Sequence, residues 1–210
     1  MARYKITDPG GLIDKIRKNY TISNRAAAQA LNKTGTYTTD ESVKLIVQRV
    51  NLDAGYVKKH LGVSDRASPD NLRVIIRANE RGTLLTRYPN MKSRRGISVS
   101  INKGSGFTEL RGAFIIGGLR GSGASGIAMN NKRAAEFFAL AAARGDSTLA
   151  KTAKLARLKD KALNRPRGVT VLHSRSINQL FTTVRDDVLP KARDFLLEDF
   201  IDQFQRLKIR

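Results

Sequence analysis

The sequence predicts an α+β fold, with helices at both ends of the chain and an antiparallel sheet of short strands between them. Apolar residues recur at helical spacing over residues 10–61 and again over 176–210. Between these regions the apolar runs are short, some alternate with polar residues, and Gly, Pro and Asn separate them. Turns instead of helices between strands favour an antiparallel sheet over βαβ units.

Residues 1–62 are expected to form the N-terminal helices. Ala26–Leu31 is a run of strong helix formers with small side chains, which lets another helix approach closely, from the same chain or from a neighbour. Thr21 or Ser23 suits the N-cap of a new segment. One bent helix and two separate helices therefore both fit residues 10–36.

A further helix is expected to begin at Thr39–Ser42, because the apolar residues that follow share one helical face. These residues are Val43, Ile46, Val47 and Val50. After a break at Asn51–Asp53, a short helix is expected to run through Leu61 and to end at Gly62.

The central sheet is expected to be built from residues 71–116 together with 169–173. In its most regular strand, apolar residues at 97, 99 and 101 alternate with polar ones, as in a half-buried strand. The expected strands are 71–78, 84–88, 97–101, 113–116 and 169–173.

Residues 117–167 are expected to be an insertion, with a Gly-rich loop followed by a basic helical region. The segment 176–210 is expected to be a long amphipathic helix. It begins with the spacing of a capping box at Ser176–Gln179, and Pro190 either kinks it or starts a second helix. We treat residues 1–210 as a single domain made of these parts.

The composition points to a polyanionic partner. Lys and Arg number 39 against 18 Asp and Glu, a formal net charge of +21, of which only +1 lies in residues 168–210. The absence of Cys excludes disulfides, thiolate nucleophiles and Cys-based metal centres. The chain has neither an apolar run long enough to span a bilayer nor a signal-peptide pattern at its start, so we expect no membrane partner and synthesis on the cytosolic side.

We expect no catalytic residue, no metal and no cofactor, and hence no enzyme. Gly121–Gly126 matches G-x-G-x-x-G, but a second βαβ unit and the acidic residue of a nucleotide site are missing. His60 and His173 have no partner at metal-ligand spacing. Three carboxylates share one face of the C-terminal helix, and basic residues near them favour a solvated or partner-facing surface over a metal site. They are Asp194, Glu198 and Asp202.

Basic residues are dense in the second half of the sheet region and in the helical region after it. This density suits sequence-independent contact with DNA phosphates, and the alternative is a solubilising surface. Aromatic residues are few and Trp is absent, which does not favour stacking on single strands. The residues expected to face DNA are Lys92, Arg94, Arg95, Lys103, Arg111, Arg120, Lys132, Arg133, Lys151, Lys154, Arg157 and Lys159.

Four segments together resemble the prophage minor tail protein Z family, the tail-completion proteins of long-tailed phages. They are similar, in order, to the family's Ala-rich helix near its start, the short basic segment after that helix, its core strand and its C-terminal helix. The segments are Ala26–Thr34, Asn51–Lys59, Gly112–Ile115 and an ending with Phe181, Leu189–Lys191 and Leu207. Residues 117–167 depart from the family pattern.

The resemblance implies a structural protein of the virion, at the head-proximal end of the tail, that is present in the host cytoplasm during assembly. It implies an oligomeric ring, for which a hexamer is one option, around double-stranded phage DNA. The implied neighbours are the tail terminator, the tail tube or tape-measure protein and a head-completion protein. Residues expected at subunit or neighbour contacts are Ala27, Ala30, Leu31, Val188, Leu196, Phe200 and Phe204.

Two other functions remain as alternatives. A free architectural protein that binds nucleic acid without sequence preference would lose affinity steeply as salt rises. A nucleotide-dependent enzyme built on Gly121–Gly126 would be protected by nucleotide against thermal unfolding.

Overall fold

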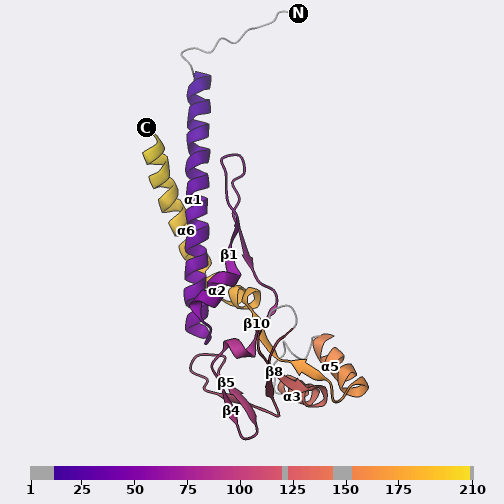
Figure 1. The fold of residues 1–210 in the computed structure, drawn as a ribbon. Helices are drawn as coiled ribbons and strands as arrows, with labels where there is room; N and C mark the ends of the chain where they lie inside the picture. Colours follow the sequence, from indigo (N-terminus) through magenta and orange to yellow (C-terminus); the bar gives the residue numbers. More distant parts are fainter. Residues whose placement is uncertain (1–11, 120–122, 144–152, 209–210) are drawn as a thin grey trace, which may run out of the picture. The chain divides into compact units, whose positions relative to one another are not determined.

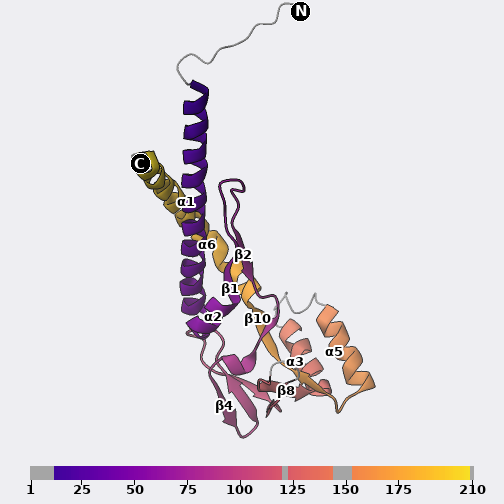
Figure 2. The same cartoon turned by 45° about the horizontal axis from the view of Figure 1, so that its top comes forward.

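The computed structural model describes residues 12–119, 123–143 and 153–208 (Figures 1 and 2). Contacts divide the chain into two compact units where we expected one domain. Unit 1 comprises Met1–Ile46, Ala54–Asn79 and Ile177–Arg210, and unit 2 comprises Val47–Asp53 and Glu80–Ser176. Helices combine with antiparallel strands, which confirms the α+β class.

The N-terminal region is one continuous helix, α1 (Leu12–Arg49), so the expected new helix at Thr39 is wrong. The hydroxyl groups at the expected start bond to carbonyl oxygens one turn back. Thr39 Oγ1 donates to the Gly35 carbonyl oxygen at 2.9 Å, and Ser42 Oγ donates to that of Thr38 at 2.6 Å. Because each hydroxyl is satisfied within the helix, it does not compete with the helical backbone.

The C-terminal helix, α6 (Ile177–Lys208), packs antiparallel to α1 within unit 1 (Figure 1). The rings of Tyr37 and Phe195 stack with centroids 4.6 Å apart, and Lys33 Nζ lies 2.7 Å from Asp199 Oδ1. The helix continues through Pro190, which excludes a second helix starting there. Its buried face confirms the expected amphipathic pattern and includes Ile177, Leu180, Val184, Val188 and Ala192.

A hairpin also covers α1 in unit 1. It follows the short helix α2 (Ala54–His60) and consists of β1 (Leu61–Asp65) and β2 (Ile75–Ala78). Leu61 therefore opens a strand, where we expected it inside the helix, and the strand expected from residue 71 begins only at residue 75. Gly35 lets the hairpin approach, because a Cβ there would lie 2.7 Å from Val74 Cγ1.

Unit 2 contains three small antiparallel sheets, and with the hairpin of unit 1 the described strands form four sheets rather than one central sheet. One sheet pairs β3 (Gly82–Leu84) with β10 (His173–Ser176), and the 3₁₀ turn η1 (Leu85–Arg87) follows β3. The second contains β4 (Asn90–Ser93), β5 (Gly96–Val99) and β6 (Thr108–Arg111). The third contains β7 (Phe114–Ile116), β8 (Gly126–Asn130) and β9 (Val169–Val171).

The strand β8 corrects the expectation that residues 117–167 are an insertion of loop and helices. It is the middle strand of its sheet, and Ile127, Ala128 and Met129 are all buried. A strand buried on both faces lacks polar alternation, which is why its short apolar run gave no strand signal. The expected helical region is present as α3 (Asn131–Ala143) and α5 (Ala153–Asn164), which pack on each other.

The last expected strand, 169–173, is two strands in different sheets, β9 and β10. Leu172 between them is buried. Across the described residues, no helix combines the length and the apolar character that crossing a membrane requires.

Candidate nucleic-acid interface

Four of the arginines expected to face DNA line one open hollow in unit 2. Arg94 and Arg95 form the turn between β4 and β5, Arg111 ends β6, and Arg133 lies in the first turn of α3. The hollow has a volume of about 670 Å³. It brings together arginines that lie up to 39 positions apart in the sequence.

Gly112 connects three parts of the hollow, which are the β4–β5 turn, the end of β6 and Arg133 of α3. The Gly112 N–H donates to the Arg95 carbonyl oxygen at 2.7 Å, which ties the β4–β5 turn to the residues after β6. Gly112 has a φ of +73°, a conformation that favours glycine. A Cβ at this position would lie only 1.9 Å from Arg133 Nη1, so the guanidinium of Arg133 rests directly on the Gly112 backbone.

One face of α3 completes the wall of the hollow. Arg133, Glu136, Phe137 and Leu140 follow the i, i+3, i+4, i+7 spacing of a single helical face, and all four line it. Leu140 is 62% exposed although it is apolar. The wall therefore offers an apolar patch beside guanidinium groups.

Two carboxylates reduce the positive charge of the hollow, Glu109 and Glu136. Ser93 Oγ donates to Glu109 Oε1 at 2.8 Å, and Arg111 Nε lies 3.3 Å from Glu109 Oε2. The hydrogen bond from Ser93, followed by that from Arg111, lowers the pKa of Glu109 below its ordinary value. Four guanidiniums against two carboxylates leave a net charge of +2 around the hollow, which suits an anion.

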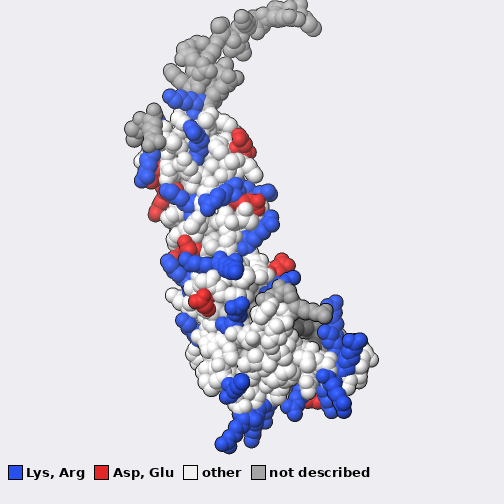
Figure 3. Space-filling model, in the orientation of Figure 1, with Lys and Arg blue, Asp and Glu red and all other residues white. Residues whose placement is uncertain are grey.

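The remaining expected DNA contacts do not line this hollow. Figure 3 shows Lys and Arg side chains over much of the visible surface. Lys92, Lys103, Lys132, Arg157 and Lys159 are exposed. Arg120 and Lys151, and the side chain of Lys154, lie outside the described residues. Unit 2 as a whole carries 20 Lys and Arg against 6 Asp and Glu.

The other motifs have structural roles or lie outside the description. The described end of the Gly-rich motif, Gly123–Gly126, leads into strand β8 and not into a helix, so it lacks the helix N-terminus of a phosphate cradle. His60 Nδ1 lies 3.3 Å from Asn79 Nδ2, and His173 Nδ1 lies 3.1 Å from the Val171 carbonyl oxygen. Within the described residues no group of His, Asp and Glu is arranged to hold a metal ion.

The residues expected at subunit contacts divide into two sets. Ala30 and Val188 are buried in unit 1, so their side chains belong to its own core and are not available to a neighbour. The half-buried members retain some accessible surface. They are Ala27, Leu31, Leu196, Phe200 and Phe204.

Sequence reasoning missed the acidic and apolar members of the hollow. Glu109 carries no periodic signal, because its place is set by its register opposite Ser98 in the β5–β6 pair. Phe137 and Leu140 share a helical face with Arg133, so helical spacing was a signal that could have found them.

Comparison of the chain with protein-family models, curated proteins and solved structures gave no match.

Proposed function

We propose that this chain is a structural protein at the head-proximal end of a phage tail, a tail-completion or neck protein whose basic surface borders the DNA path. The observation that carries the proposal is the convergence of four arginines on one open hollow in unit 2. The resemblance of its segments to the minor tail protein Z family supplies the biological setting.

The chemistry of the hollow suits contact with a DNA backbone. Guanidinium groups match phosphate oxygens in geometry and charge. Contacts between arginines and phosphates hold a duplex without regard to base sequence, because the phosphates carry no sequence information. A subunit that borders a DNA channel needs contact of this kind, since every sequence of the genome passes it.

The direct test is deletion of the coding sequence in the phage that carries it. We expect filled heads and separate tails by negative-stain electron microscopy, and joined particles when the intact chain is supplied in trans. Normal yields of joined, infectious particles after deletion would overturn the proposal.

The arginine hollow also favours the second candidate, a free architectural protein that binds nucleic acid. The two functions are compared by measuring the affinity of the chain for duplex DNA at several salt concentrations. Four phosphate contacts predict a loss of affinity of about 10²-fold between 50 and 200 mM salt. A steeper loss of 10³–10⁵-fold indicates about 6–10 contacts and favours the architectural function.

The contribution of individual arginines is separable with single variants. Arg94→Gln, Arg95→Gln, Arg111→Gln or Arg133→Gln should each reduce the log–log salt slope by about 1. Arg167→Gln is the matched control, because Arg167 is an exposed arginine of unit 2 that does not line the hollow. Equal effects of all five substitutions would show that the hollow is not the contact.

A further inference from the structure

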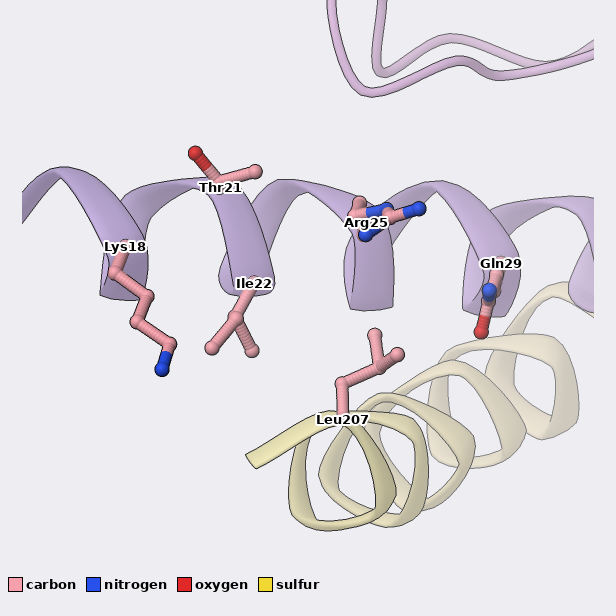
Figure 4. A pocket seen from close by; sticks show the side chains of 6 residues that line it. All are labelled: Lys18, Thr21, Ile22, Arg25, Gln29 and Leu207. Atoms are coloured by element: carbon pink, nitrogen blue, oxygen red, sulfur yellow. The ribbon is translucent and has the colours of Figure 1, made fainter. Parts of the chain in front are cut away.

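An open groove separates the N-terminal half of α1 from the C-terminal end of α6 within unit 1. Its volume is about 560 Å³. Figure 4 shows the Leu207 side chain of α6 pointing across the groove towards α1, where Ile22 faces it. The groove is thus apolar at its centre, and Lys18 and Arg25 make its α1 wall basic. The lining residues are Lys18, Thr21, Ile22, Arg25, Gln29 and Leu207.

The side of α6 that points away from α1 carries an exposed stripe of acidic and apolar residues, which complements the basic and apolar groove. Asp194, Leu197, Glu198 and Ile201 follow i, i+3, i+4, i+7 spacing and share one face. Leu197 is 63% and Ile201 is 55% exposed. We call these four residues the α6 stripe.

The α6 stripe cannot occupy the groove of its own chain. Asp199 pairs with Lys33 on the side of α6 that faces α1. Leu197 and Ile201 lie two positions on either side of Asp199. At 100° per residue they lie about 160° from it around the helix, so they point away from α1.

Charge and size both make a second copy of this chain the fitting occupant. Within the described part of the chain, neither the basic pair Lys18 and Arg25 nor the acidic pair Asp194 and Glu198 forms an ion pair. The stripe spans about 10 Å of helix and the α1 wall of the groove about 16 Å. An acidic, apolar helix face therefore fits a basic, apolar groove of sufficient length.

We propose that the α6 stripe of one copy docks into the α1–α6 groove of the next copy. The contact is heterologous, because it joins two different surfaces and leaves one of each free at the ends. Such contacts close into a ring or continue as a filament. The closed ring, as opposed to a filament, rests on the proposed function. The inference deepens that function by naming the two surfaces that a ring of this chain would use.

The test exchanges the charges of the two surfaces in the full-length chain. One variant, Lys18→Glu with Arg25→Glu, makes the groove acidic, and the other, Asp194→Lys with Glu198→Lys, makes the stripe basic. By sedimentation velocity we expect reversible association of the unaltered chain, and at least tenfold weaker association of each variant alone. An equimolar mixture of the two variants should associate again, because the groove of each now complements the stripe of the other.

The controls change charge elsewhere in unit 1. Lys59→Glu and Asp70→Lys alter exposed residues outside both surfaces and should leave association unchanged. Circular dichroism establishes that every variant is folded. An unaltered chain that stays monomeric both with and without short duplex DNA would overturn the proposal, as would a variant mixture that fails to associate.

The interface and the function fail separately. If the charge-exchanged variants each restore joined particles in the deletion strain as well as the unaltered chain does, the interface is refuted and the tail function stands. If the deletion strain makes normal particles while the mixture experiment succeeds, the tail function is refuted and the interface stands.

Discussion

At the scale of single residues, the hollow depends on one glycine and one carboxylate. Gly112 adopts a left-handed conformation and leaves the space in which the Arg133 guanidinium lies. Glu109 accepts hydrogen bonds from Ser93 and Arg111 beside the same guanidiniums. Neither residue is cationic, yet each controls how much positive charge the hollow presents.

Gly112→Ala should separate stability from anion binding. The left-handed conformation should cost about 1–2 kcal/mol of unfolding free energy for Ala. Gly104→Ala is the matched control, because Gly104 has a φ of +81° and open space around it, and it should cost a similar amount. Urea denaturation should therefore give similar losses of stability for the two variants. Only Gly112→Ala also displaces Arg133, so only this variant should reduce the salt slope of DNA binding, by about 1. An unchanged slope would show that Arg133 makes no phosphate contact.

Glu109→Gln should strengthen DNA binding roughly twofold to fivefold, because it removes one exposed negative charge from the hollow. The unaltered chain should show the same gain only on acidification. Since the pKa of Glu109 is lowered, the carboxylate stays charged to a lower pH than an ordinary glutamate, and the gain begins below that range. Binding titrations across acidic pH check this, and the variant should lack the component of the rise that Glu109 causes.

At the scale of elements, α1 is the support on which unit 1 is built. One side chain, Asn32, binds the hairpin connection through both of its polar atoms. Its Nδ2 donates to the Ala67 carbonyl oxygen at 2.9 Å, and its Oδ1 accepts from the Ala67 N–H at 2.8 Å. Ala67 is buried, so this pair fixes the position of the hairpin along the helix.

Asn32→Ala should lower the free energy of unfolding by about 1–3 kcal/mol, because it leaves buried backbone groups of Ala67 without partners. Asn24→Ala is the control on the same helix. Its Nδ2 makes one exposed hydrogen bond, to the Pro69 carbonyl oxygen at 3.1 Å, and its loss should cost less than about 1 kcal/mol. Equal losses in urea denaturation would mean that the Asn32 pair does not hold the hairpin.

At the scale of the whole molecule, net charge opposes assembly. Each subunit carries +21, so copies repel one another unless a polyanion offsets the charge. Short duplex DNA should therefore increase the sedimenting mass of the chain at low salt. DNA that instead dissociates existing oligomers would contradict a ring around a DNA path.

The sequence alone was sufficient for the α+β class, the long C-terminal helix and strand β5, because each has a periodicity that extends over neighbouring residues. It failed at β8, whose burial on both faces removes that periodicity, and at Thr39, whose hydroxyl bonds to α1 itself. The sequence shows that basic residues are abundant. It does not show which of them lie close together in the folded chain.

The convergence of Arg94, Arg95, Arg111 and Arg133 follows from strand register and from the hydrogen bond between Gly112 and Arg95. The exposure of Leu197 and Ile201 likewise follows from which side of α6 packs on α1. The net charge of +21 could be read from the residues one at a time. The hollow and the groove required the folded chain, because they consist of side chains that only long-range packing brings together.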